Sequence, residues 1–130
     1  MKHWIFLLVP VAVVALWICF SGRWSRPVNY VCITPEEAKQ IMDNETGYII
    51  LDVRTYEEFE TGHIPGAVCL PLDEVASKAK DVIPDQDATY LVYCRSGRRS
   101  KEAAKILVEL GYTDIKEFGG IIDWPYAVEK

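Results

Sequence analysis

The chain has 130 residues, half of them hydrophobic and a quarter charged, which suits one packed domain and argues against global disorder. Its formal net charge of −5 at pH 7 argues against a nucleic-acid partner. Four cysteines without a Cys-x-x-Cys pair, and two histidines far apart, indicate neither a disulfide framework nor a metal site. We therefore expect no metal, no cofactor and no nucleic acid.

An uncharged and almost wholly apolar segment, residues 4–22, stands near the start of the chain and is followed by Arg23. Its length fits a membrane-spanning helix, which needs about 17–25 residues, better than the apolar part of a signal peptide, about 7–15. We expect residues 1–24 to be a retained single transmembrane anchor, with a cleaved export signal as the alternative. Positive charge on both sides leaves the orientation open, and we expect a domain outside the cytoplasm, in the periplasm.

A short linker, residues 25–29, precedes the domain that we predict for residues 30–130. The domain starts with a strand over 30–33. Thr34 can cap the helix that follows, because Pro35 suits the first helical position and a glutamate three residues after Thr34 fits a capping box. This helix is expected to end near residue 44.

Short apolar runs then alternate with helical patterns. Since this order is typical of βαβ units, it predicts an α/β fold with a central, mainly parallel five-stranded sheet and helices on both faces. Ligands in such sheets bind beyond the carboxyl ends of the strands. We expect strands at 48–53, 68–70, 89–93 and 115–118, and helices at 55–60, 73–83 and 101–110.

The stretch from Cys94 to Ser100 carries the strongest chemical signal. Cys94 lies between a strand end and a helix start, where unpaired backbone N–H groups and the helix dipole favour a thiolate. Arg95, Arg98 and Arg99 add positive charge, and their spacing leaves open which of them points into the site. A cationic loop on an acidic chain indicates a small anion as ligand.

The chain resembles the rhodanese family of sulfurtransferases over about residues 31–126. The resemblance rests on motifs that occur in the family's order and spacing. They are Leu51–Arg54, Glu57–Phe59 with Gly62–Ala67, Cys94–Ser100, and Gly111–Tyr112 with Gly119–Gly120 and Trp124. It implies a single rhodanese-like domain behind the N-terminal membrane or export segment.

The resemblance also implies a reaction. Cys94 is expected to take the outer sulfur of thiosulfate or a persulfide donor, and a thiol acceptor, or cyanide in an assay, then removes that sulfur from the Cys94 persulfide. Backbone N–H groups and cationic side chains of the loop are expected to bind the anionic donor. These substrate-binding residues are Arg95, Ser96, Gly97, Arg98, Arg99 and Ser100.

Other polar residues receive structural roles. Asp52 and Arg54 are expected to form a pair that supports the base of the site, with a catalytic role as the alternative. His63 lies in a Gly-His-Ile-Pro-Gly turn and is interpreted as a scaffold residue rather than a general base. Cys32 and Cys69 stand in short apolar strands and are predicted to be buried.

Two other functions stay open. One is a membrane-tethered sulfur-carrier or binding module with little turnover, although the presence of Cys94 argues against a purely binding role. The other is a small cysteine-dependent phosphatase, which uses a Cys-x5-Arg loop. Here the sixth residue after the cysteine is Ser100, and Tyr93 replaces the histidine that often precedes that cysteine. The loop is therefore interpreted as sized for a sulfur species.

Overall fold

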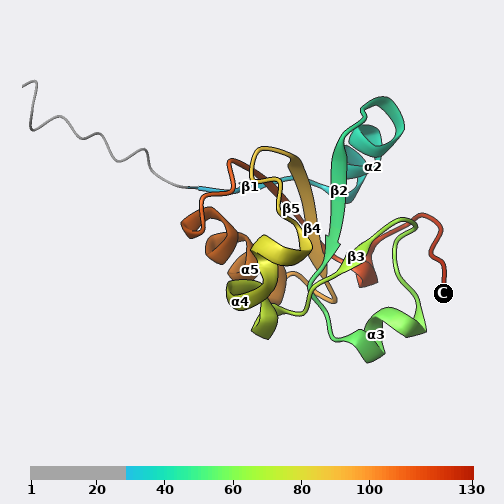
Figure 1. Cartoon of the computed structure of the whole chain (residues 1–130). Coiled ribbons are helices and arrows are strands. Elements are labelled where there is room, and N and C mark those ends of the chain that lie inside the picture. Colours follow the sequence, from blue (N-terminus) through green and yellow to red (C-terminus); the bar gives the residue numbers. More distant parts are fainter. Residues whose placement is uncertain (1–28) are drawn as a thin grey trace, which may run out of the picture.

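A five-stranded parallel sheet forms the centre of the computed structural model, which describes residues 29–130 (Figure 1). The strand order is β1-β5-β4-β2-β3, and each neighbouring pair runs parallel, so the predicted architecture is confirmed. The strand that ends in Cys94, β4, is the central one. The strands are β1 (Val31–Cys32), β2 (Tyr48–Asp52), β3 (Val68–Cys69), β4 (Thr89–Cys94) and β5 (Asp114–Gly120).

Helices cover both faces of the sheet. Figure 1 shows α4 and α5 on one side of the strands and α2 on the other. The helices are α2 (Pro35–Asn44), α3 (Tyr56–Thr61), α4 (Leu72–Val82), α5 (Arg98–Glu109) and the short 3-10 helix η2 (Ile121–Asp123). The expected cap of α2 is present, because the Thr34 hydroxyl oxygen accepts the Glu37 backbone N–H at 3.1 Å.

The side chains of β4 alternate between two buried clusters. Tyr90, Val92 and Cys94 pack toward α4 and α5, whereas Leu91 and Tyr93 pack on the side of α2. All five are fully or almost fully buried, as a central parallel strand requires. The alternation therefore places the Cys94 side chain on the face covered by α5.

Most boundaries shift by one or two residues from the sequence prediction, and two of the differences change how a residue is interpreted. The helix expected at 101–110 begins at Arg98, so three residues assigned to the loop belong to its first turn. The first strand is only Val31–Cys32, at the edge of the sheet. Both of its residues are exposed, so the prediction that Cys32 is buried is wrong: the edge position leaves it covered on one side only.

The predicted N-terminal apolar helix and anchor or signal (1–24), and the linker up to residue 28, lie outside the described residues. Among residues 29–130, no helix combines the length and the apolar character that crossing a membrane requires.

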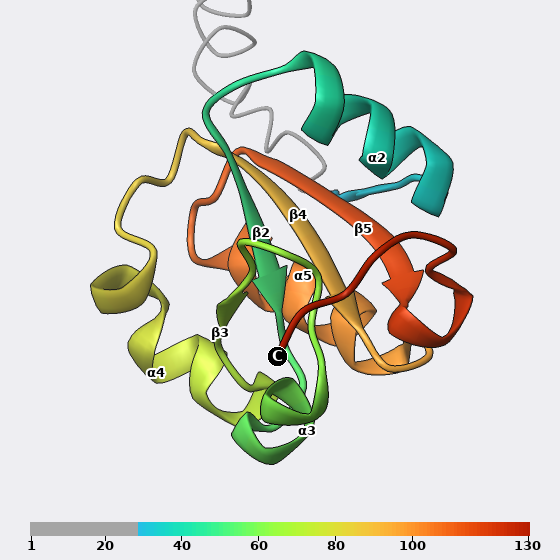
Figure 2. The same cartoon turned by 90° about the vertical axis from the view of Figure 1, so that its right-hand side faces the viewer.

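The C-terminal segment returns to the turn that follows α3. Figure 2 shows it passing in front of the sheet after β5. His63 and Glu129 exchange two backbone hydrogen bonds of 2.8 Å, which form an isolated antiparallel bridge. The Gly62–Ala67 turn is therefore held by the end of the chain.

Replacing Tyr93 by Phe tests how far this turn depends on the central strand. The buried Tyr93 hydroxyl accepts the Ile64 backbone N–H at 3.1 Å, and burial raises the pKa of the phenol. Without it a buried N–H loses its partner, so we expect the free energy of unfolding to fall by about 1–3 kcal/mol in urea titrations. The matched Tyr56→Phe removes an exposed hydroxyl bound to Glu74 and should cost less than about 0.5 kcal/mol. Equal losses in the two variants would refute this role of Tyr93.

Candidate active site

The loop between β4 and α5 is short and closely packed. Three residues separate Cys94 from Arg98, and the last of them, Gly97, has a φ of 109°, a left-handed conformation that favours glycine. The loop lies directly against β5, because a Cβ placed on Gly120 would overlap the carbonyl of Arg95. The sequence thus brings strand end, helix start and β5 together around one sulfur atom.

Hydrogen-bond donors converge on that sulfur. Cys94 is 1% exposed, the Gly97 backbone N–H donates to its Sγ at 3.0 Å, and the Ser100 Oγ lies 3.4 Å away. Burial by itself raises the pKa of the Cys94 thiol, but the bonds from the Ser100 hydroxyl and the loop backbone outweigh it and lower the pKa. The backbone donors are those of Ser100, Gly97 and Ser96. The geometry therefore favours a reactive thiolate.

Ser100 also contacts a residue that the sequence reasoning missed. Its buried hydroxyl lies 2.7 Å from Oε1 of Glu117, which is itself only 2% exposed. Glu117 belongs to β5 and lies on the same face as Ile115, toward α5 and Cys94. The period of two along this strand, which puts a carboxylate where an apolar side chain is expected, is the signal that would have found it.

The three arginines of the loop have different surroundings. The Arg99 guanidinium binds Glu58 of α3 through two bonds of 2.7 and 3.0 Å. This bond is the main cause that lowers the pKa of Glu58 from 4.5 to about 2. Arg95 and Arg98 are exposed and take part in none of the ion pairs found within residues 29–130. Their role in anion binding stays a prediction, as does that of Arg99.

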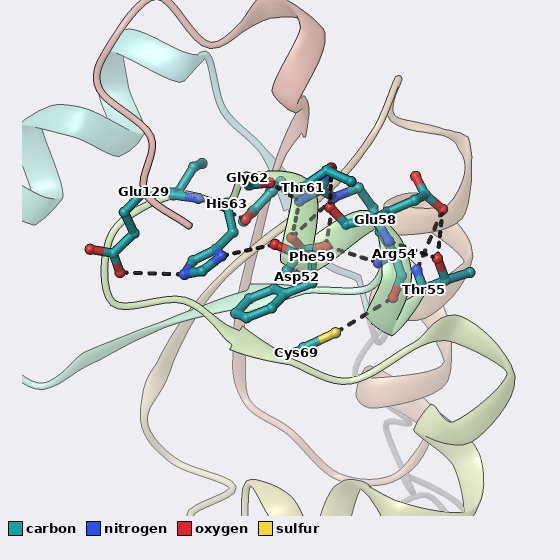
Figure 3. Close-up of polar contacts among 12 residues, drawn as sticks. Asp52, Arg54, Thr55, Glu58, Phe59, Thr61, Gly62, His63, Cys69 and Glu129 are labelled. Atoms are coloured by element: carbon teal, nitrogen blue, oxygen red, sulfur yellow. Dashed lines mark hydrogen bonds and ion pairs between the residues drawn. The ribbon is translucent and has the colours of Figure 1, made fainter.

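Asp52 and Arg54 form the expected ion pair (Figure 3). Arg54 donates from Nε at 3.0 Å and from a terminal nitrogen at 2.7 Å, and the same nitrogen donates to the Gly62 carbonyl at 2.7 Å. Both side chains are buried, and Asp52 lies in register with Tyr93, one residue before the nucleophile. The pair ties the end of β2 to the turn after α3.

His63 contacts the scaffold (Figure 3). Its ring stacks on Phe59 at 3.7 Å between centroids, its Nδ1 lies 3.0 Å from the Phe59 carbonyl oxygen, and its Nε2 lies 3.3 Å from Glu129. These contacts agree with a scaffold role and give no sign of a general base.

Cys69 is half-buried at the end of β3, and its Sγ lies 3.7 Å from the Arg54 carbonyl oxygen. Burial, with the nearby charge of Asp52, raises the pKa of this thiol to about 11. Cys69 is therefore an unreactive thiol near neutral pH. Within residues 29–130, no group of three or more histidine, cysteine or acidic side chains is placed to hold a metal ion.

Comparison with known proteins gives consistent matches. The family model described as a rhodanese-like domain matches residues 34–125. The thiosulfate sulfurtransferase PspE of Escherichia coli is 41% identical over 73 residues, which is 56% of this chain and 70% of the relative. The putative sulfur carrier protein YrkF of Bacillus subtilis is 41% identical over 98 residues, which is 75% of this chain, and the match spans only 52% of that relative.

Solved structures with rhodanese in their description also resemble this chain. A rhodanese with anions from Escherichia coli superposes with a TM-score of 0.60 at 37% identity and covers 64% of this chain and 98% of its own. A rhodanese-related protein from Thermoplasma volcanium gives a TM-score of 0.67 at 31% identity, covering 77% of this chain and 98% of its own.

The ion pair between Glu58 and Arg99 predicts a pH-dependent stability. Because the folded pKa of Glu58 is lowered from 4.5 to about 2, its contribution is complete above the unfolded value and is lost as the pH falls through the folded one. Near neutral pH, the free energy of unfolding of the wild-type protein should exceed that of Glu58→Gln by about 1 kcal/mol or less. This difference in stability should vanish as the pH falls through about 2. Urea unfolding across this range measures it.

Glu57→Gln is the matched control, because Glu57 is an exposed neighbour in the first turn of the same helix. It should change stability by a few tenths of a kcal/mol at most. A Glu58→Gln defect that persists undiminished at the acid end would contradict the assignment to the ion pair.

Proposed function

The chain belongs to the rhodanese-like domain family, and from this membership we propose that it is a sulfurtransferase that moves a sulfane sulfur from thiosulfate or a persulfide donor to a thiol through a persulfide on Cys94. The observation that carries the proposal is the buried Cys94 sulfur, which receives the Gly97 N–H at 3.0 Å and has a lowered pKa owing to the Ser100 and backbone hydrogen bonds that outweigh burial. The sulfurtransferase named among its relatives adds support.

In the first step the Cys94 thiolate attacks the outer sulfur of thiosulfate. The bond between the two thiosulfate sulfur atoms breaks, and sulfite leaves with the bonding electron pair. The enzyme keeps the outer sulfur as a persulfide anion, which the loop N–H groups are suited to stabilise. Arg95 and Arg98, exposed cations beside the loop, are suited to attract the dianionic donor.

In the second step an acceptor thiolate attacks the outer sulfur of the persulfide. The sulfur–sulfur bond to Cys94 breaks, its electron pair returns to Cys94, and the acceptor leaves as a persulfide. Cyanide in place of the thiol yields thiocyanate. The two half-reactions constitute ping-pong catalysis, in which Cys94 alone holds the transferred atom.

A sulfur carrier with little turnover is the second candidate, and the name of YrkF favours it. The same persulfide then serves a dedicated protein donor and acceptor rather than thiosulfate. A phosphatase is disfavoured, because the position that needs arginine holds Ser100, whose hydroxyl binds the Glu117 carboxylate at 2.7 Å.

We also propose that residues 4–22 anchor the protein in a membrane by a single span, with the domain outside the cytoplasm. The support is the uncharged apolar length of that segment. Export followed by signal cleavage is the alternative.

Cys94→Ser tests the proposed reaction. Full-length wild-type protein should convert thiosulfate and cyanide to thiocyanate and should gain one sulfur atom on Cys94, seen by mass spectrometry. The variant should lose at least about 1,000-fold of this activity, because the nucleophile is gone. Cys69→Ser, which removes the unreactive thiol, should remain within about twofold of wild type. Full activity in Cys94→Ser would end the proposal.

The choice of donor separates an enzyme from a carrier. Rapid loading of Cys94 by thiosulfate supports the enzyme, and loading only by a protein persulfide supports the carrier. Release of phosphate from an aryl phosphate faster than sulfur transfer would exclude both.

A reporter fused after Lys130 tests the membrane proposal. Alkaline phosphatase, which is active only outside the bacterial cytoplasm, should be active and should sediment with membranes. A soluble, active and shortened fusion would indicate a cleaved signal, and an inactive one a cytoplasmic domain.

A further inference from the structure

A buried carboxylate lies behind the loop, and the reaction proposed above does not use it. Glu117, on β5, is 2% exposed, and its Oε1 accepts the Ser100 hydroxyl at 2.7 Å and the Gly119 backbone N–H at 2.8 Å. None of the ion pairs formed within residues 29–130 includes it. A buried carboxylate without a counter-ion is costly, and such groups gather at sites that use their charge.

Ser100 connects this carboxylate to the nucleophile. Its Oγ lies 2.7 Å from Glu117 and 3.4 Å from the Cys94 sulfur. A hydroxyl has one proton, so it can donate to the carboxylate or to a thiolate but not to both. While it donates to Glu117, it can only accept from Cys94, so Glu117 competes with the Ser100 bond that lowers the pKa of the Cys94 thiol.

Two backbone carbonyls also lie near the Ser100 hydroxyl, those of Gly97 at 3.0 Å and Gly119 at 3.4 Å. The Glu117 oxygen is the nearest acceptor and the only one of the three that belongs to an ionisable group. Hydrogen bonds to a charged acceptor are about twice as strong as neutral ones. The Ser100 proton is therefore directed at Glu117.

We propose that Glu117 is a positioning residue that sets the protonation state of Cys94 through Ser100. When the thiolate forms, the Sγ–H bond breaks and its proton leaves to solvent, while the Ser100 hydroxyl turns its proton from Glu117 to the sulfur. Glu117 keeps its charge and the hydrogen bond from the Gly119 backbone N–H. The formation of the thiolate therefore costs the hydrogen bond between Ser100 and Glu117, and this cost opposes loss of the Cys94 proton.

This inference deepens the proposed function, and its consequence for sulfur transfer rests on it. The charge of Glu117 disfavours a thiolate on the empty loop. In the persulfide the negative charge lies on the outer sulfur, about 2 Å farther along. Glu117 therefore favours the sulfur-loaded state over the free thiolate, and it protects the resting cysteine, since oxidation follows thiolate character.

Other titratable groups surround the pair, and each is bound elsewhere or exposed. Arg99 and Asp52 are already paired, with Glu58 and Arg54. Cys32 of β1, in register with Glu117, and Lys101 of α5 are exposed, and burial, followed by the Glu117 carboxylate, raises the pKa of the Cys32 thiol. Among these charges, Glu117 is the one joined to Cys94 through the Ser100 hydroxyl.

Glu117→Gln in the full-length protein tests the proposal. The rate of Cys94 alkylation by iodoacetamide, read from the Cys94 peptide by mass spectrometry, is measured from about pH 5 to about pH 10. Since the variant gives the Ser100 proton a neutral acceptor in place of a charged one and removes a negative charge within about 6 Å of the sulfur, the midpoint of the profile should fall by about 1–2 pH units. A merely structural role would change the unfolding temperature without moving this midpoint.

Two further variants provide controls. Glu102→Gln removes the same charge from the exposed face of α5 and should shift the midpoint by less than about 0.2 units. In a Ser100→Ala background, which lacks the shared proton, the effect of Glu117→Gln should fall by at least half. The proposal is overturned if Glu117→Gln shifts the midpoint no more than Glu102→Gln does. It is also overturned if the shift caused by Glu117→Gln is as large in the Ser100→Ala background as in the wild-type background.

A measurement on the wild-type chain decides the matter if Glu117→Gln does not fold. With carbon-13 at the glutamate carboxyls, one resonance should move with the Cys94 titration and should lose this inflection in Cys94→Ser. Absence of such a resonance overturns the proposal.

Neither the alkylation profile nor the carbon-13 resonance depends on sulfur transfer. Failure of the proposed function is therefore seen separately, because wild-type Cys94 would then gain no sulfur from any donor. Where loading occurs, the pH profile of persulfide formation should shift with that of alkylation in Glu117→Gln, whereas discharge by cyanide, which removes no thiol proton, should not shift. A shift of both half-reactions, or of neither, counts against the proposal.

Discussion

The hydrogen bonds to the Cys94 sulfur are the interaction on which the rest of the site depends. Burial alone would hold this cysteine as an inert thiol. Three loop residues bring the amino end of α5 back over the end of β4, so that the Gly97 N–H reaches the sulfur at 3.0 Å and Ser100 lies at 3.4 Å. A core position thereby becomes one where hydrogen-bond donors stabilise a negatively charged sulfur, which is the property that the proposed reaction needs.

The strand β5 contacts that loop in two ways, through its backbone at Gly120 and through the carboxylate of Glu117. A side chain at Gly120 would overlap the Arg95 carbonyl, so the loop rests on bare backbone. Three residues earlier, Glu117 places a carboxylate under Ser100. The backbone of β5 therefore supports the loop at Gly120, and its Glu117 side chain competes, as proposed above, with the Cys94 sulfur for the Ser100 proton.

The arginines of β2's end and of the loop divide into two that form ion pairs and two that are exposed. Arg54 and Arg99 each bind a carboxylate and hold segments together, β2 to the turn after α3 and α5 to α3. Arg95 and Arg98 are exposed beside the loop. A count of three loop arginines consequently overstates the cationic charge available to a ligand, since that of Arg99 is already opposed by Glu58.

Local patterns in the sequence were sufficient for the α/β fold, the five strands and the position of Cys94 at a strand end, because periodicity, caps and turns act between residues close in the chain. They placed α5 three residues late, since a left-handed Gly97 leaves no periodic signal. Only the tertiary structure decided that β1 is an edge strand with an exposed Cys32, that Arg99 is bound by Glu58, 41 residues away, and that Glu117 lies behind Cys94. Each of these depends on strand order and on which face of a strand meets a helix, and both are contacts between distant residues that no local pattern records.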